Sequence, residues 1–123
     1  MISVAQPKSN ILLVNEKTLS FDQAVHTVIK LDDRVIIHLK TDGFLRGDPM
    51  VGRNVLCFDK NGEMLWRIED TGMTIGEGED NVPQSFLSLS LKDDGKIRVG
   101  NPDAFFFVNP ENGMLYDGEP KYY

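Results

Sequence analysis

The sequence is poor in residues that form cross-links and metal sites. It contains one cysteine, Cys57, and two histidines, His26 and His38. A single cysteine cannot form an internal disulfide, and together with two histidines it supplies too few ligands for a structural zinc site. We therefore expect a buried thiol and a reducing compartment.

Long apolar runs are also missing. The longest, "ILLV" from Ile11 to Val14, is far shorter than the roughly 20 apolar residues that cross a bilayer. The first residues lack the basic start, the long apolar stretch and the small-residue cleavage site of a signal peptide. These features predict a cytoplasmic protein with no membrane partner.

Positive charge is scarce relative to negative charge. The 123 residues include 13 Lys and Arg but 19 Asp and Glu, which gives a formal net charge of -6. The sequence shows no basic stripe that could attract phosphates, so we expect no nucleic-acid partner. A negative charge of this size usually keeps a small protein soluble, and it would also attract a basic protein. The length predicts one domain, residues 1–123, with an adequate core.

Turn signals built from Gly, Asn and Asp are abundant between short apolar runs. They occur at Asp32-Asp33, Asn61-Gly62, Asp94-Gly95 and Asn112-Gly113. Short apolar runs separated by such turn residues are typical of antiparallel β-hairpins. The sequence predicts a mainly β protein whose hairpins form a sandwich, an open barrel or stacked sheets.

The hairpin "FDKNGEMLW", Phe58 to Trp66, has a looser copy in "VNPENGMLY", Val108 to Tyr116. A loop of Lys60, Asn61 and Gly62 would place Gly62 in the left-handed conformation and Asp59 opposite Glu63. The same register pairs Phe58 with Met64 and Leu56 with Trp66. It predicts Trp66 as a core residue.

Two further hairpins follow the same logic. A loop of Asp93, Asp94 and Gly95 pairs Leu91 with Ile97 and Leu89 with Val99, and leaves Ser88, Ser90 and Arg98 on a wet face. The turn "NPENG" joins "AFFFV" to "MLY". Because the three phenylalanines alternate between faces, we expect this strand to be buried on both sides.

The stretch from Ser20 to Lys40 has two interpretations. Helical spacing of apolar residues and a capping box at Ser20 and Gln23 favour one short helix near Phe21–Val28. Alternatively, a loop at Asp32–Arg34 joins two strands rich in β-branched residues, with Ile29 on the same face as Ile37. We favour the hairpin, and a short helix or turn before it stays open.

Catalytic and metal-binding patterns are not recognisable. His26 and His38 lack a third ligand and a nearby carboxylate, which favours two partly exposed strand histidines. The acidic loop "GEGEDN", residues 76–81, lacks the lysine and helix signal of a phosphate loop and the ligand alternation of an EF-hand. We expect no enzymatic activity, no cofactor and no metal.

Two long connections rich in Gly, Pro and Asp are the predicted partner-binding segments, because loops of this length in small domains are often functional. They run from Asp42 to Arg53 and from Asp70 to Gln84. The candidate partner-binding residues are Asp42, Asp48, Asp70, Glu77, Glu79 and Asp80.

The segments "NVLCFDKNGEMLWRIED" and "FFFVNPENGMLYDGE" resemble the strand-turn-strand unit of propeller blades of the pyrroloquinoline-quinone dehydrogenase type. The chain has strands for about two blades and no counterpart of that family's cofactor ligands. The pattern "RNVLCFDKNGEMLWRIE", followed by a loop and "GNPDAFFFVNPENGMLY", is also similar to small acidic bacterial immunity proteins of contact-dependent and polymorphic toxin systems.

The second resemblance implies a function without catalysis. An immunity protein binds a toxin domain, in some systems a nuclease, and occludes it, and a basic toxin would suit the acidic residues of this chain. The alternatives are a β-barrel that binds a small ligand or an enzyme built on one, which require a cavity with converging polar groups. A structural or adaptor module is the third.

Overall fold

The computed structural model describes residues 2–40, 50–75 and 82–121, and all regular structure in this part of the chain is β-strand. The first sheet consists of β1 (Val4–Lys8), β2 (Ile11–Val14) and β3 (Lys17–Ser20). The middle sheet consists of β4 (Val25–Lys30), β5 (Arg34–Leu39), β6 (Val55–Asp59) and β7 (Met64–Arg67). The third consists of β10 (Ser88–Leu91), β11 (Ile97–Gly100), β12 (Ala104–Val108) and β13 (Leu115–Pro120), and a small pair is formed by β8 (Thr74–Ile75) and β9 (Val82–Pro83).

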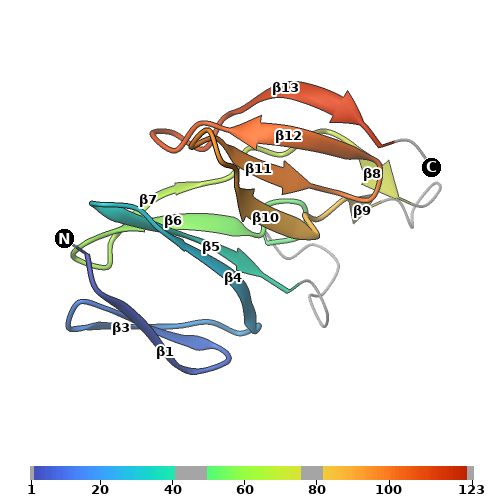
Figure 1. Cartoon of the computed structure of the whole chain (residues 1–123). Helices are drawn as coiled ribbons and strands as arrows, with labels where there is room; N and C mark the ends of the chain where they lie inside the picture. Colours follow the sequence, from blue (N-terminus) through green and yellow to red (C-terminus); the bar gives the residue numbers. More distant parts are fainter. Residues whose placement is uncertain (1, 41–49, 76–81, 122–123) are drawn as a thin grey trace.

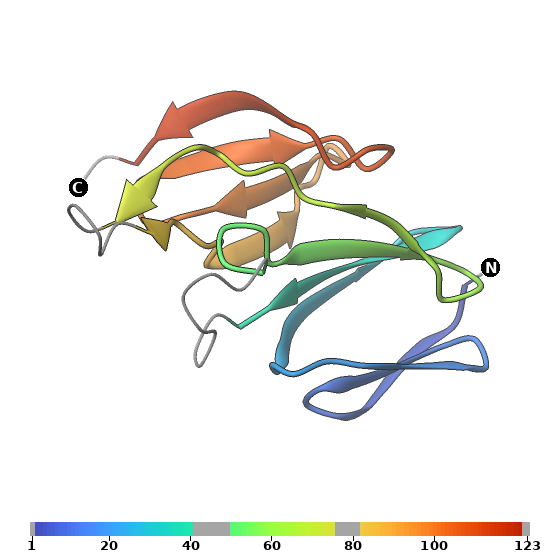
Figure 2. The same ribbon diagram turned by 180° about the vertical axis from the view of Figure 1, so that it is seen from behind.

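The three larger sheets are stacked, with the middle sheet between the other two (Figures 1 and 2). Each is an antiparallel meander in which neighbours along the chain pair with each other. Of the three arrangements that the sequence left open, the protein therefore adopts stacked sheets.

The middle sheet contributes side chains to two separate cores. Along β5, Val35 and Ile37 pack against the first sheet, whereas Ile36 between them packs against the third. This follows from the alternation of side chains along a strand. Fully burying a side chain of this size contributes about 1.5–3 kcal/mol, so both faces of the middle sheet stabilise the stack.

The short helix that the sequence left open near Phe21–Val28 is not formed, because β4 occupies Val25–Lys30. Its apolar residues mimic helical spacing because Val28 packs toward the first sheet and Ile29 toward the third, so both faces of β4 carry apolar side chains. The hairpin interpretation is confirmed, but its register differs by one residue. Arg34 already belongs to β5 and the amide of Leu31 donates to its carbonyl, so Ile29 pairs with Ile36 and not with Ile37.

The hairpin of β6 and β7 follows the predicted register only next to its turn. Gly62 has φ +78°, the amide of Asp59 donates to the carbonyl of Glu63, and Phe58 pairs with Met64, as expected. A register shift then makes Cys57, not Leu56, the partner of Trp66. Trp66 is 7% exposed, so the predicted core position is confirmed, but it faces the third sheet.

The hairpins of the third sheet pair as the sequence predicted. Leu89 pairs with Val99, Leu91 pairs with Ile97, and β12 continues through the "NPENG" turn into β13. The expectation that "AFFFV" is buried on both sides is wrong. Phe106 packs on the core, while Phe105 and Phe107 lie on the opposite face and stay partly exposed, because no described layer covers this end of the stack.

Candidate functional site

Five of the six predicted partner-binding residues, Asp42, Asp48, Glu77, Glu79 and Asp80, lie outside the described residues. The sixth, Asp70, is exposed, and its Oδ1 accepts a hydrogen bond from the amide of Gly72 at 2.9 Å. It lines an open hollow of about 390 Å³ with Arg53 and Arg67. Asp70 therefore caps a turn beside two arginines and is not part of a purely acidic surface.

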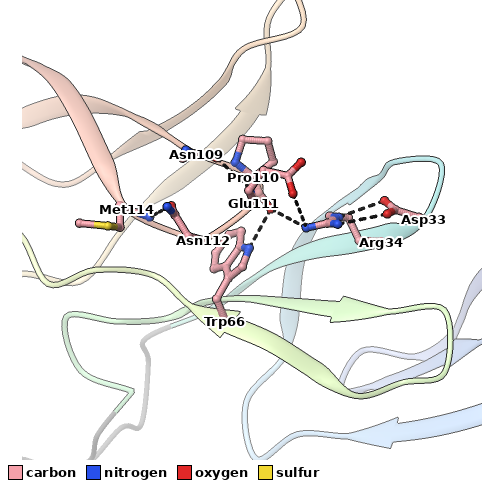
Figure 3. A network of polar contacts seen from close by, with 8 residues as sticks. All are labelled: Asp33, Arg34, Trp66, Asn109, Pro110, Glu111, Asn112 and Met114. Atoms are coloured by element: carbon pink, nitrogen blue, oxygen red, sulfur yellow. Dashed lines mark hydrogen bonds and ion pairs between the residues drawn. The ribbon is translucent and has the colours of Figure 1, made fainter.

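The two similar hairpins meet at one polar network (Figure 3). Trp66 Nε1 donates to the carbonyl of Pro110 at 2.8 Å, and Arg34 Nη1 donates to the same oxygen at 3.0 Å. Arg34 also forms a two-pronged pair with the carboxylate of Asp33 at 3.0 and 3.1 Å. The hydrogen bond to Arg34 lowers the pKa of Asp33, and this network fixes the β12–β13 turn on the middle sheet.

A second polar cluster is buried between the middle sheet and the segment before β10. Asn54 Nδ2 donates to the carbonyls of Leu39 at 2.7 Å and Phe86 at 2.9 Å, and its Oδ1 accepts from the amide of Phe86 at 2.8 Å. His38 Nε2 donates to the same Phe86 carbonyl at 2.7 Å. His38 is 3% exposed, so the prediction of two partly exposed histidines holds only for His26.

The histidines contact each other edge to face, with their Nδ1 atoms 3.3 Å apart. A carbonyl only accepts hydrogen bonds, so the proton of neutral His38 is on Nε2 and its Nδ1 lone pair faces His26. Burial lowers the pKa of His38, and the nearby His26 lowers it further, against the opposing effect of the hydrogen bond to Phe86. Neutral His38 is therefore a structural donor.

This lowered pKa predicts a loss of stability in mild acid. Below the unfolded-state pKa of about 6.5, the unfolded chain binds a proton that folded His38 does not bind. The free energy of unfolding therefore decreases as the pH is lowered. One such group gives a slope of up to about 1.4 kcal/mol per pH unit. Urea unfolding between pH 7.5 and pH 5 is expected to show a steeper decline for the natural chain than for His38→Gln, which keeps an amide donor. Equal slopes would contradict the assignment.

Cys57 has no features of a reactive thiol. It is 0% exposed, and burial raises its pKa to about 12. The thiolate is the nucleophile in cysteine chemistry, so this thiol is inert in the folded protein. Among the described residues, no group of three or more His, Cys, Asp or Glu side chains is arranged to hold a metal ion.

Aromatic and basic side chains lie together on the outer face of the third sheet. Arg98 and Lys121 lie over the ring of Phe105, at 4.2 and 4.5 Å from its centroid, and Lys96 lies 5.3 Å from that of Phe107. Phe107 stacks on Tyr116 with centroids 5.7 Å apart. We call Lys96, Arg98, Phe105, Phe107, Tyr116 and Lys121 the aromatic–cationic face.

Gly100 positions the ring of Phe105. A Cβ on Gly100 would lie 3.0 Å from Phe105 Cδ1 and 2.7 Å from Ser88 Oγ, so the ring lies directly over the glycine backbone. Phe105 pairs with Gly100 across β11 and with Glu119 across β13. Each cation above a ring contributes about 0.5–1 kcal/mol at an exposed site. The face is therefore ordered by its own contacts before any partner arrives.

Sequence reasoning found only part of this face. It placed Ser88, Ser90 and Arg98 on a wet side, but it treated the phenylalanine strand as fully buried. The missing signal was the pairing of β11 with β12, which places Phe107 beside Arg98 and Phe105 beside Gly100. The grouping of the three cations was also not predicted, because Lys96 lies just before β11, Arg98 lies in β11 and Lys121 lies after β13.

Comparison with known proteins gives one match. A family model described as a domain of unknown function, DUF7957, matches residues 1–106. This range includes Lys96, Arg98 and Phe105, and ends before Phe107, Tyr116 and Lys121. No curated protein and no solved structure shows a significant match.

Proposed function

Because this chain belongs to the DUF7957 family of domains of unknown function, we propose a function from its surface, namely that of a non-catalytic module that binds a partner protein. The specific form that we propose is an immunity protein that occludes a toxin domain in the bacterial cytoplasm. The described residues include no helix long and apolar enough to span a membrane.

The aromatic–cationic face is the observation that carries this proposal. Phe, Tyr and Arg are enriched at the centres of protein interfaces, where a few such residues supply most of the binding energy. Tyr116 is 39% exposed, and Phe105 and Phe107 are half-buried on an ordered sheet. A rigid surface of this type loses little conformational entropy on binding.

The net charge of -6 supports the same proposal at long range. It would steer a partner of net positive charge, as a toxin that binds phosphates would be, toward the chain. The predicted contacts of the acidic loops stay a prediction, because Asp70 is the one described member of that set.

Co-expression with the product of the neighbouring reading frame tests this function. We expect the tagged chain to co-purify with that protein and to protect cells from it. Because an anchoring side chain at an interface is worth about 2 kcal/mol or more, replacing Phe105 and Tyr116 together by alanine should weaken binding by at least about thirtyfold.

Met64→Ala with Leu65→Ala is the matched control, since both side chains are exposed apolar residues of β7 on the middle sheet. It should bind as the natural chain does. If the natural chain neither binds nor protects, or if both double variants lose binding equally while retaining their circular dichroism spectra, the proposed function is wrong.

A further inference from the structure

The aromatic–cationic face is the structural counterpart of a face that is covered elsewhere in the same chain. Trp66 of β7 pairs with Cys57, and the matching residue of β13, Tyr116, pairs with Phe107. Trp66 is covered by the "NPENG" turn of the next sheet and is 7% exposed, whereas Tyr116 is 39% exposed. The third sheet thus has on its outer side the face that, in the middle sheet, packs against the third sheet.

The charge of this face differs from that of the whole chain. Its three cations, Lys96, Arg98 and Lys121, form no ion pair with any described carboxylate. Asp103 lies opposite Lys121, whose amide donates to its carbonyl, but the Asp103 carboxylate accepts a hydrogen bond from Gln84 Nε2 at 2.7 Å. Glu119 pairs with Phe105. A partner that covers the rings must also neutralise these cations, because a buried unpaired charge is costly.

We infer that the aromatic–cationic face receives an acidic segment of a partner protein that also carries apolar side chains. This inference rests on the proposed function and adds the chemistry of the contact. Carboxylates of the segment pair with Arg98, Lys121 and Lys96, and its apolar groups cover Phe107 and Tyr116. A bidentate arginine–carboxylate pair supplies orientation as well as energy.

The contacts favour a polypeptide over single-stranded nucleic acid. Base stacking needs open ring faces, but Arg98 and Lys121 already lie over Phe105, and Phe107 already stacks on Tyr116. Carboxylates can pair with the cations where they now lie. The chain's net charge of -6 also repels a polyphosphate more strongly than a short segment with few carboxylates.

Fluorescence anisotropy with the full chain and defined probes tests this inference. The probes are a short fluorescein-labelled copolymer of glutamate and tyrosine with few carboxylates, the matching copolymer of glutamine and tyrosine, and an oligothymidylate of about 15 nucleotides. We expect the glutamate–tyrosine copolymer to bind at least about tenfold more tightly than either other probe, and to bind more weakly as salt is added.

Arg98→Gln with Lys121→Gln removes two charges from the face and should weaken binding of the glutamate–tyrosine copolymer by about tenfold or more. Lys8→Gln with Lys30→Gln removes two charges from exposed positions in β1 and β4 and should leave binding within about twofold. Circular dichroism and urea midpoints confirm that each variant folds. If both double variants lose the same amount of copolymer binding, only the total charge of the chain matters and the inference is wrong.

Other outcomes also overturn it. Tighter binding of the oligothymidylate, lost in the Arg98→Gln and Lys121→Gln variant, would make the face a nucleic-acid surface. Dimerisation of the natural chain in sedimentation experiments, lost in the same variant, would assign the face to a second copy. The proposed function and this inference fail by different results. If the neighbouring-gene product binds the natural chain and this variant equally, the proposed function stands and only the role of this face is wrong.

Discussion

Replacing Gly113 by alanine is expected to lower the free energy of unfolding by about 2–5 kcal/mol. Gly113 has φ +75°, and a Cβ built there would lie 2.5 Å from Cε3 of Trp66. The left-handed backbone costs an alanine roughly 1–2 kcal/mol, and the overlap with a buried ring adds about 1–3 kcal/mol. The indole cannot withdraw easily, because its Nε1 is bonded to the carbonyl of Pro110.

The matched control is Gly95→Ala, in the β10–β11 turn. Gly95 has φ +86°, but a Cβ there would meet nothing within 4 Å, so only the backbone cost of about 1–2 kcal/mol is expected. Urea unfolding followed by circular dichroism measures both changes. In a Trp66→Leu background, Gly113→Ala should cost no more than Gly95→Ala. Equal losses for the two glycines in the natural chain would show that the turn does not rest on Trp66.

The likeness of the two hairpins is now explained by this contact. "FDKNGEMLW" supplies the ring, and "VNPENGMLY" supplies the turn that covers it. The sequence predicted both turns from their Asn-Gly pairs, because a left-handed glycine is a local property of the chain. It did not predict that one hairpin rests on the other, because stacking of sheets is decided by side chains distant in sequence.

Strand register was predictable only where the turn determines it. The pairs Leu89 with Val99 and Phe58 with Met64 lie close to tight turns and are confirmed. A single extra residue beyond the β6–β7 turn moved Trp66 to the opposite face, and bulges of this kind leave little trace in an apolar pattern. Strands of the middle sheet were also hard to orient, because apolar residues on both faces remove the alternation that reveals a register.

In the candidate site too, the contacts within one hairpin were predicted and those between distant parts of the sequence were not. Ser88, Ser90 and Arg98 were correctly placed on a wet face from one hairpin alone. The rings beside Arg98 come from the next strand, and Lys121 follows the last one, so the face exists only after β11, β12 and β13 pair. Net charge, which favoured a basic partner, averages over the whole chain and hides a local surface of opposite sign.

Replacing Asn54 by alanine is expected to cost about 3–5 kcal/mol, because three buried hydrogen bonds are lost together. Asn54 is 0% exposed, and its side chain bonds both backbone groups of Phe86 and the carbonyl of Leu39. The carbonyl of Phe86 keeps its bond to His38, but the amide of Phe86 loses its acceptor. A buried amide without a partner costs about 1–3 kcal/mol by itself.

Two further variants separate the causes of this loss. Asn54→Leu fills a similar volume without hydrogen bonds, so it should stay destabilised by at least about 2 kcal/mol if the bonds matter more than the cavity. Asn61→Ala, at an exposed turn position, should change stability by less than about 0.5 kcal/mol. Urea unfolding distinguishes these results. A leucine variant as stable as the natural chain would mean that Asn54 acts by filling space. Phe86 would then be held in the core between the middle and third sheets by its ring and not by its backbone.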